Sequence, residues 1–126
     1  MLKPLILIVD DEDRFCSTLK RVMKEKGIEA DTANSGMEAL EKIKQRDYDV
    51  IILDLKMPGL SGIETLKEIK KFNDKIEVIL LTGHSSVDSG IDGMKLGAYD
   101  YIIKPVDIDK LLEIVNSAYL LKSSRF

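Results

Sequence analysis

Two continuous apolar runs, each ending in aspartate, most restrict what this chain can fold into. Residues 5–9 read LILIV and residues 50–53 read VIIL. Runs of this length and β-branched content are typical of strands buried on both faces, as in a parallel sheet covered by helices. The first run ends in Asp10 and Asp11, and the second ends in Asp54. A carboxylate at the end of a buried strand loses hydration, which it must recover from a metal ion, a cation or hydrogen-bond donors.

Three further strands and five helices are expected from the rest of the chain. Residues 28–33 alternate apolar and polar side chains, residues 76–81 form another apolar run, and residues 99–103 form a fifth strand. Apolar residues at helical spacing follow each strand. The signals that delimit the helices are Gly27 after the first, capping boxes at Ser35 with Glu38 and at Ser61 with Glu64, and Asp107 before a last helix that ends near Leu121.

The alternation of strand and helix predicts a single (βα)5 unit with a doubly wound parallel sheet and right-handed crossovers. The second and fifth strands are the most polar and belong at the edges, which the strand order 2-1-3-4-5 satisfies. In such a sheet ligands bind at the carboxyl ends of the strands where the winding reverses, here between the first and third strands. The order therefore brings together Asp10, Asp11 and Asp54.

Composition and charge indicate one globular domain. The chain has 126 residues, 44% of them apolar and 33% charged, and a net charge of -3. This balance argues against nucleic-acid binding, and a basic group in the first helix, formed by Lys20, Arg21, Lys24 and Lys26, is interpreted as a solvated face. The one cysteine, Cys16, cannot form an internal disulfide, and no run is long enough to span a membrane. A cytoplasmic location is expected.

The acids at the strand ends suggest a magnesium site with a nucleophile. Carboxylates with carbonyl and water oxygens suit Mg²⁺, whereas zinc would favour His or Cys. Thr82 and Lys104 reach the same rim from the fourth and fifth strands, where a hydroxyl and an ammonium can hold phosphoryl oxygens. Asp54 is then the natural nucleophile for an acyl phosphate. Taken singly, each has a simpler interpretation: a turn or cap for Asp54, a strand-end hydroxyl for Thr82, a surface charge for Lys104.

The chain resembles the receiver domain of two-component response regulators over nearly its whole length. The resemblance rests on IVDDE (residues 8–12), ILDLKMPGLSG (52–62), LLTGH (80–84) and KLGAYDYIIKP (95–105). It implies a flavodoxin-like fold, a receiver domain over residues 1–122, and a tail or linker over residues 123–126. The sequence around TGH and MKLGAYD is most similar to that of receivers attached to enhancer-binding transcriptional activators.

The resemblance also implies roles for individual residues. Asp54 would accept a phosphoryl group from a phosphohistidine of a sensor histidine kinase, and Mg²⁺ would be bound by Asp10, Asp11, Asp54 and the backbone carbonyl of Lys56. Thr82 would contact the phosphoryl group, Lys104 would pair with it, and Tyr101 would be the aromatic switch residue. The bond between Lys104 and Pro105 is often cis in this family. Such a module is a phosphoacceptor that assists its own phosphorylation and dephosphorylation, and not an enzyme acting on a separate substrate.

Two further positions are expected to tune the phosphate lifetime. Lys56 lies two residues after Asp54, and His84 lies two residues after Thr82; in receivers these positions flank the path of the hydrolytic water. A basic pair there is expected to alter the rate of dephosphorylation. His84 is otherwise interpreted as a solvated loop residue, because no orienting partner for a metal-binding histidine is evident.

A partner surface is expected on the last helix and its neighbours. The apolar residues of the last helix cover more of its circumference than contact with a sheet requires. The helix that contains Gly90 and Gly93 should be easily shifted, because each glycine costs about 1 kcal/mol relative to alanine. These two helices and the strand between them would contact a downstream effector or a fused output domain, or form a homodimer on phosphorylation.

Two rival interpretations share part of this pattern. A small Mg²⁺-dependent phosphatase of the haloacid-dehalogenase type also uses an aspartate nucleophile, a threonine and a lysine, and Asp11 with Asp13 superficially fits its D-x-D spacing. That family, however, needs a cap or substrate pocket for which this length leaves no room. The other rival is a receiver that has lost phosphorylation and serves only as a binding module, which the complete set of five site residues disfavours.

Overall fold

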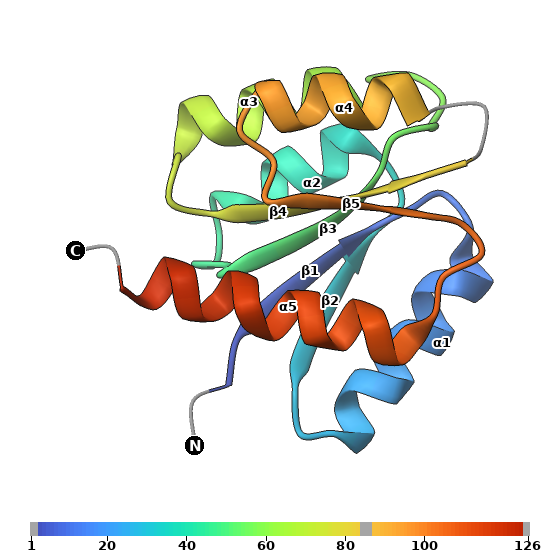
Figure 1. The fold of residues 1–126 in the computed structure, drawn as a ribbon, viewed down its shortest axis with the longest axis vertical. Helices are drawn as coiled ribbons and strands as arrows, with labels where there is room; N and C mark the ends of the chain where they lie inside the picture. The colour runs from blue at the N-terminus through green and yellow to red at the C-terminus, as the bar shows by residue number, and fades with distance from the viewer. Residues whose placement is uncertain (1–2, 84–86, 125–126) are drawn as a thin grey trace.

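A computed structural model describes residues 3–83 and 87–124 and contains a five-stranded parallel sheet with helices on both faces (Figure 1). The strand order is β2-β1-β3-β4-β5, as predicted. The strands are β1 (Leu5–Val9), β2 (Glu29–Ala33), β3 (Val50–Asp54), β4 (Glu77–Thr82) and β5 (Asp100–Ile103). The helices are α1 (Asp13–Glu25), α2 (Gly36–Ile43), α3 (Gly62–Phe72), α4 (Val87–Lys95) and α5 (Ile108–Ser123).

Burial explains why the strands take this order. Every residue of β3 and β4 is buried, whereas the edge strands β2 and β5 include partly or fully exposed positions. A parallel strand that is buried on both faces needs an apolar side chain at almost every position, and an edge strand does not. One core lies under α2 and α3 on one face of the sheet, and a second lies under α1 and α5 on the other.

The predicted helix ends are confirmed. The Ser35 hydroxyl accepts a hydrogen bond from the Glu38 N–H at 3.1 Å, and the Ser61 hydroxyl accepts one from Glu64 at 3.2 Å. Asp107 caps α5, and Gly27, with φ of +76°, follows the end of α1. α5 ends two residues later than expected, at Ser123.

The glycines of α4 have a packing role that composition alone did not indicate. A Cβ on Gly93 would lie 2.2 Å from Cδ1 of the fully buried Leu80, and a Cβ on Gly90 would lie 3.1 Å from the ring of Tyr101. The two glycines therefore let α4 approach β4 and β5 closely. The glycines lower the intrinsic stability of the helix, but a larger residue at either position would prevent this close contact.

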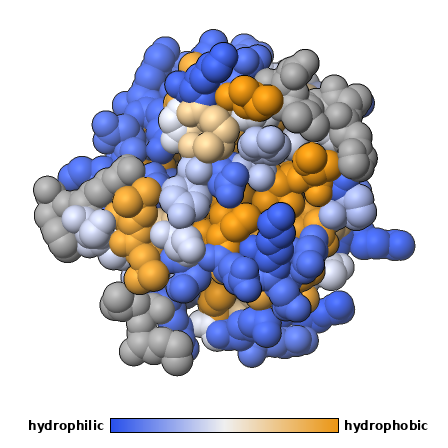
Figure 2. All heavy atoms as spheres, in the orientation of Figure 1, coloured by the Kyte–Doolittle hydropathy of each residue, from blue (hydrophilic) through white to orange (hydrophobic). Residues whose placement is uncertain are grey.

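The apolar surface that α5 leaves exposed is smaller than the sequence suggested. Leu111, Val115 and Ala118 are buried, and Leu112, Ile114 and Tyr119 pack against the same core from the sides. Only the last turns of α5 leave leucines exposed, at Leu120 and Leu121. Further exposed apolar side chains come from α4 and the residue that follows it, namely Ile91, Met94 and Leu96. Figure 2 shows that hydrophobic atoms reach the surface between α4 and α5 on this face.

Candidate functional site

Three carboxylates meet where β1 and β3 end. Asp10 follows β1 and is fully buried, Asp54 is the last residue of β3 and is 5% exposed, and Asp11 is exposed. One oxygen of each of these side chains lies within 4.8 Å of one oxygen of each of the others. The parallel register places Val9 beside Leu53, so the residues that follow each strand emerge at the same edge. The predicted grouping of these acids is confirmed.

Each buried carboxylate is held by backbone and lysine donors. Asp10 accepts a hydrogen bond from the Glu12 N–H at 2.9 Å through Oδ1 and one from Lys104 Nζ at 3.0 Å through Oδ2. Asp54 accepts one from the Lys56 N–H at 3.2 Å, and its other oxygen lies 3.7 Å from Lys104 Nζ. Lys104 follows the last residue of β5 and reaches the same edge of the sheet, as the sequence predicts. Its ammonium contacts both buried acids.

The acids change the protonation of Asp54. Burial, and then the charges of Asp10 and Asp11, raise the pKa of Asp54 to about 6, although the Lys56 N–H and the Lys104 ammonium oppose the shift. Burial alone would lower the pKa of Lys104, but the hydrogen bond and charge of Asp10, with the charge of Asp54, raise it above its ordinary value. The cluster carries an excess of negative charge that one lysine only partly offsets.

The donor set fits a hard divalent cation. Asp10, Asp11 and Asp54 offer carboxylate oxygens and no sulfur or nitrogen, which suits Mg²⁺. Asp11 and Asp54 border a hollow of about 610 Å³ that is open to solvent, leaving room for water and for a phosphoryl group. It is lined by Asp11, Glu12, Asp54, Lys56, Met57, Pro58, Gly83 and Lys104.

Thr82 and Tyr101 lie on the side of the site that faces α4. Thr82 ends β4, is buried, and donates its hydroxyl to the carbonyl of Gly83 at 3.1 Å. Tyr101 is partly buried, with its ring against Gly90 of α4. The peptide bond between Lys104 and Pro105 is cis. His84, the other expected tuning residue, lies outside the described residues.

Three residues of this site were not singled out from the sequence. Glu12 places Oε1 3.3 Å from Lys104 Nζ, and the ring centroid of Phe15 lies 5.2 Å from the same nitrogen. A third acid directly after Asp10 and Asp11 is the signal that could have identified Glu12. Gly62 lies against the loop after β3, where a Cβ would be 2.4 Å from Cα of Leu55. Gly62 donates its N–H to the Leu55 carbonyl at 3.2 Å, so it fixes the loop that carries Lys56.

The geometry does not favour the phosphatase interpretation. Asp13, the second acid of the D-x-D spacing, is the first residue of α1 and is exposed. The acid cluster among the described residues is made by Asp10, Asp11 and Asp54 and does not include Asp13. Asp10 and Asp54 are both buried and contact Lys104, but the one that also lines the open hollow is Asp54, at the end of the third strand and not the first.

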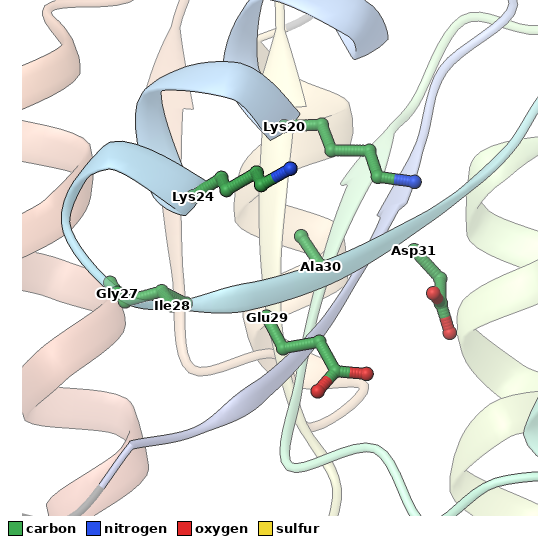
Figure 3. A pocket seen from close by; sticks show the side chains of 7 residues that line it. All are labelled: Lys20, Lys24, Gly27, Ile28, Glu29, Ala30 and Asp31. Atoms are coloured by element: carbon green, nitrogen blue, oxygen red, sulfur yellow. The ribbon is translucent and has the colours of Figure 1, made fainter.

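A second hollow, of about 450 Å³, lies beside the edge strand β2 and is lined by no expected site residue. Figure 3 shows Lys20 and Lys24 extending from α1 on one side of β2, with the carboxylates of Glu29 and Asp31 on the other side of the strand. Arg46 pairs with Glu29 at 2.7 Å and with Asp31 at 2.8 Å. The basic residues of α1, including Lys20 and Lys24, are exposed, which confirms their interpretation as a solvated face.

Comparison with known proteins places the chain beside bacterial signalling regulators. A model of the response regulator receiver domain matches residues 6–116. Transcriptional regulatory protein ZraR of Klebsiella oxytoca is 45% identical over 106 residues, which are 84% of this chain and 24% of ZraR. Regulatory protein AtoC of Escherichia coli is 38% identical over 95% of this chain and 26% of its own length. The chain therefore spans about a quarter of the length of these curated relatives.

Solved structures of similar domains have the same fold. A response regulator receiver domain from Clostridium thermocellum superposes with a TM-score of 0.91 at 39% identity, covering 95% of this chain and 97% of that one. NtrX from Brucella abortus superposes with a TM-score of 0.91 at 30% identity, covering 97% of this chain and 28% of NtrX. Among the described residues, no helix has the length and apolar character needed to cross a bilayer.

Proposed function

This chain belongs to the receiver-domain family of response regulators, the signalling modules of two-component systems, and on that premise we propose that Asp54 is its phosphoacceptor. The observation that carries the proposal is the position of Asp54, a buried carboxylate at a strand end that faces two other acids, a lysine and an open hollow. A structural aspartate gains nothing from such a setting, because the neighbouring acids destabilise its ionised form.

The proposed reaction moves a phosphoryl group from a phosphohistidine of a sensor kinase to Asp54. A carboxylate oxygen of Asp54 attacks phosphorus, the P–N bond breaks, and the histidine imidazole leaves with the bonding electron pair and is neutralised by a proton. Asp54 must be ionised to attack. With a pKa of about 6, Asp54 is mostly ionised at neutral pH while remaining a stronger base than an ordinary aspartate.

Asp10, Asp11, Asp54 and the backbone carbonyl of Lys56 are the proposed magnesium ligands. When bound, Mg²⁺ would offset the negative charge that gathers on the phosphoryl oxygens during transfer. The Lys56 N–H already holds one oxygen of Asp54, which leaves the other oxygen toward Lys104 and the hollow. The ammonium of Lys104 would then pair with a phosphoryl oxygen, and the hydroxyl of Thr82 would turn from Gly83 to donate to another.

The signal is proposed to leave through Thr82 and Tyr101. Phosphorylation adds about 1.5 to 2 negative charges at this rim. Movement of Thr82 toward the phosphoryl group would open space for Tyr101 to turn inward, away from Gly90 and α4. Shifting a two-state equilibrium from 1:99 to 99:1 takes roughly 5.5 kcal/mol, more than one neutral hydrogen bond supplies, so both contacts and the cation are expected to contribute.

The proposed partners are a sensor histidine kinase and an effector or output domain outside this chain. The α4, β5 and α5 face is the proposed contact surface, now on the evidence of Ile91, Met94 and Leu96 rather than α5 alone. A homodimer formed through this face on phosphorylation, a cytoplasmic location and the lack of direct nucleic-acid binding belong to the same proposal. Sedimentation with and without beryllium fluoride tests the dimer, and an unchanged monomer would contradict it.

Lys56 and His84 are proposed to set the lifetime of the phosphate. The side chain of Lys56 is exposed at the border of the hollow, where its charge would act on the departing phosphoryl group or the incoming water. Phosphate release from wild type is compared with release from the Lys56→Asn, His84→Ala double variant. Equal half-lives would refute the tuning role without affecting the assignment of Asp54.

Phosphorylation by acetyl phosphate tests the assignment of Asp54. Wild type should take up one phosphoryl group in the presence of Mg²⁺ and none with a chelator, and Asp54→Asn should take up none. Asp47→Asn is the matched control, because Asp47 is an exposed aspartate outside the site. Uptake by Asp54→Asn equal to that of wild type, or loss of uptake in Asp47→Asn, would refute the proposal.

A further inference from the structure

The ammonium of Lys104 lies closer to the α1 side of the site than to Asp54. Its distances are 3.0 Å to Asp10 Oδ2, 3.3 Å to Glu12 Oε1 and 3.7 Å to Asp54 Oδ2. Pairing with a phosphoryl group on Asp54 would draw the ammonium toward Asp54 and weaken its contact with Glu12. The contacts that hold Lys104 in this resting position decide how easily it moves.

The side chain of Glu12 contacts Lys104 and does not cap its own helix. It is the N-cap residue of α1, and an N-cap side chain commonly accepts a hydrogen bond from the first turn of the helix. The Glu12 side chain makes no such bond. Its backbone N–H is fixed by Asp10 at 2.9 Å, and its carboxylate extends to Lys104.

Phe15 also contacts Lys104 in this resting position. Its ring centroid lies 5.2 Å from Lys104 Nζ, within the range of a cation–π contact. The ring packs against the core formed under α1 and α5, so its place is set by that packing. Glu12 and Phe15 therefore come from one short segment at the start of α1, and both contact Lys104.

We propose that Glu12 and Phe15 are positioning residues that hold Lys104 in a resting place on the α1 side and so oppose its transfer to a phosphoryl group on Asp54. The expected effect on phosphorylation rests on the proposed function. The contacts of Lys104 with Glu12 and Phe15 do not depend on phosphorylation. Glu12 and an anionic tetrahedral group on Asp54 would compete for the ammonium of Lys104. Weakening either contact should favour the phosphorylated arrangement.

Affinity for beryllium fluoride at saturating Mg²⁺ tests the consequence. Glu12→Gln should bind this phosphoryl mimic roughly two- to five-fold more tightly than wild type, the range expected for one exposed ion pair. Asp13→Asn is the matched control, because it removes the same charge from the next residue, which makes no ion pair with Lys104 among the described residues. An equal gain in both variants, or no gain in Glu12→Gln, would refute the proposal. A wild type that fails to bind beryllium fluoride would refute the proposed function instead.

The resting contacts are measured directly by NMR of protein labelled with ¹³C-lysine, with Lys104 assigned by Lys104→Arg. The Phe15 ring should shift the Lys104 Cε protons upfield, and Phe15→Leu should abolish this shift while conserving apolar volume. Glu12→Gln should reduce the shift, Asp13→Asn should leave it unchanged, and beryllium fluoride should reduce it in wild type. A Lys104 resonance that is the same in wild type, Phe15→Leu and Glu12→Gln would refute the proposal whether or not the protein is phosphorylated.

Discussion

Asp54 lies in a setting that disfavours its ionised form, although the proposed reaction needs that form. Burial and two neighbouring acids make its ionised form costly, yet the proposed reaction requires that form. Lys104 and the Lys56 N–H reduce the cost without removing it, and a divalent cation would reduce it further. Ionised Asp54 therefore lowers the stability of the fold when no cation is bound, and this effect can be measured.

Asp54→Asn should stabilise the protein in a chelator, to a degree that depends on pH. Folding raises the pKa of Asp54 from 3.8 to about 6, so between these values the folded state binds more protons and the contribution of Asp54 to stability falls as pH rises. The variant should gain about 1 to 3 kcal/mol above about pH 6, and the gain should shrink toward pH 4. Urea unfolding across this range measures it. A gain that does not vary with pH would contradict the assigned cause.

Gly62→Ala should destabilise the fold by about 3 kcal/mol, the upper end of typical overpacking costs. The added Cβ would meet the backbone of Leu55 at 2.4 Å and the Asp54 carbonyl at 2.7 Å, and backbone atoms cannot step aside as a flexible side chain can. Gly83→Ala is the control, because a Cβ there would meet nothing within 4 Å. Urea unfolding of both variants checks the difference. Equal stability would show that the loop after β3 can shift freely.

At the scale of elements, α4 is where the sequence interpretation was incomplete. Helix propensity treats Gly90 and Gly93 as weaknesses, and propensity is local information that can be read from the chain. The contacts of Gly93 with Leu80 and of Gly90 with Tyr101 join residues that are distant along the chain, so no local pattern reveals them. The exposed surface of α5 was overestimated for the same reason, because the core under α1 and α5 also partly covers the sides of the helix.

Gly93→Ala distinguishes packing from propensity by the sign of its effect. Propensity alone predicts a gain of about 1 kcal/mol. The contact with Leu80 predicts a net loss of about 1 to 2 kcal/mol, because Leu80 is fully buried and has little room to move. Asp92→Ala, at an exposed position of α4, should follow propensity. Thermal or urea unfolding decides, and a stabilised Gly93→Ala would show that α4 is not held closely against β4.

Lys122→Met should loosen the end of α5. Lys122 Nζ lies 2.6 Å from Asp49 Oδ1, and the other oxygen of Asp49 accepts the Leu5 N–H at 2.8 Å, so this pair ties α5 to the start of β1 and β3. Partial burial supports a loss of about 1 kcal/mol and faster amide exchange in the last turn of α5. Lys71→Met, which removes an exposed pair with Glu68, should change stability by less than about 0.5 kcal/mol. The same loss in both variants would contradict a specific anchor.

For the whole molecule, the sequence predicted the fold and the grouping of the acids because both follow from strong, regular patterns. Apolar runs identified the buried strands, the two more polar strands were assigned to the edges, and the strand order brought Asp10, Asp11 and Asp54 together. What it missed depends on side-chain reach and close backbone approach, as with Glu12 beside Lys104 and Gly62 against Leu55. Strand periodicity sets which residues share an edge but not which rotamer each adopts.

Asp54 is the proposed carrier of the phosphoryl group, and its position in the site is the reason for that proposal. The most direct measurement is treatment with Mg²⁺ and acetyl phosphate, reduction of the acyl phosphate with borohydride, and mass spectrometry of the peptides. An aspartyl phosphate is reduced to homoserine, which marks the position permanently. Homoserine is expected at residue 54 in wild type, and none is expected in Asp54→Asn. Homoserine at another aspartate, or at no position in wild type that has been shown to bind Mg²⁺, would contradict the proposal.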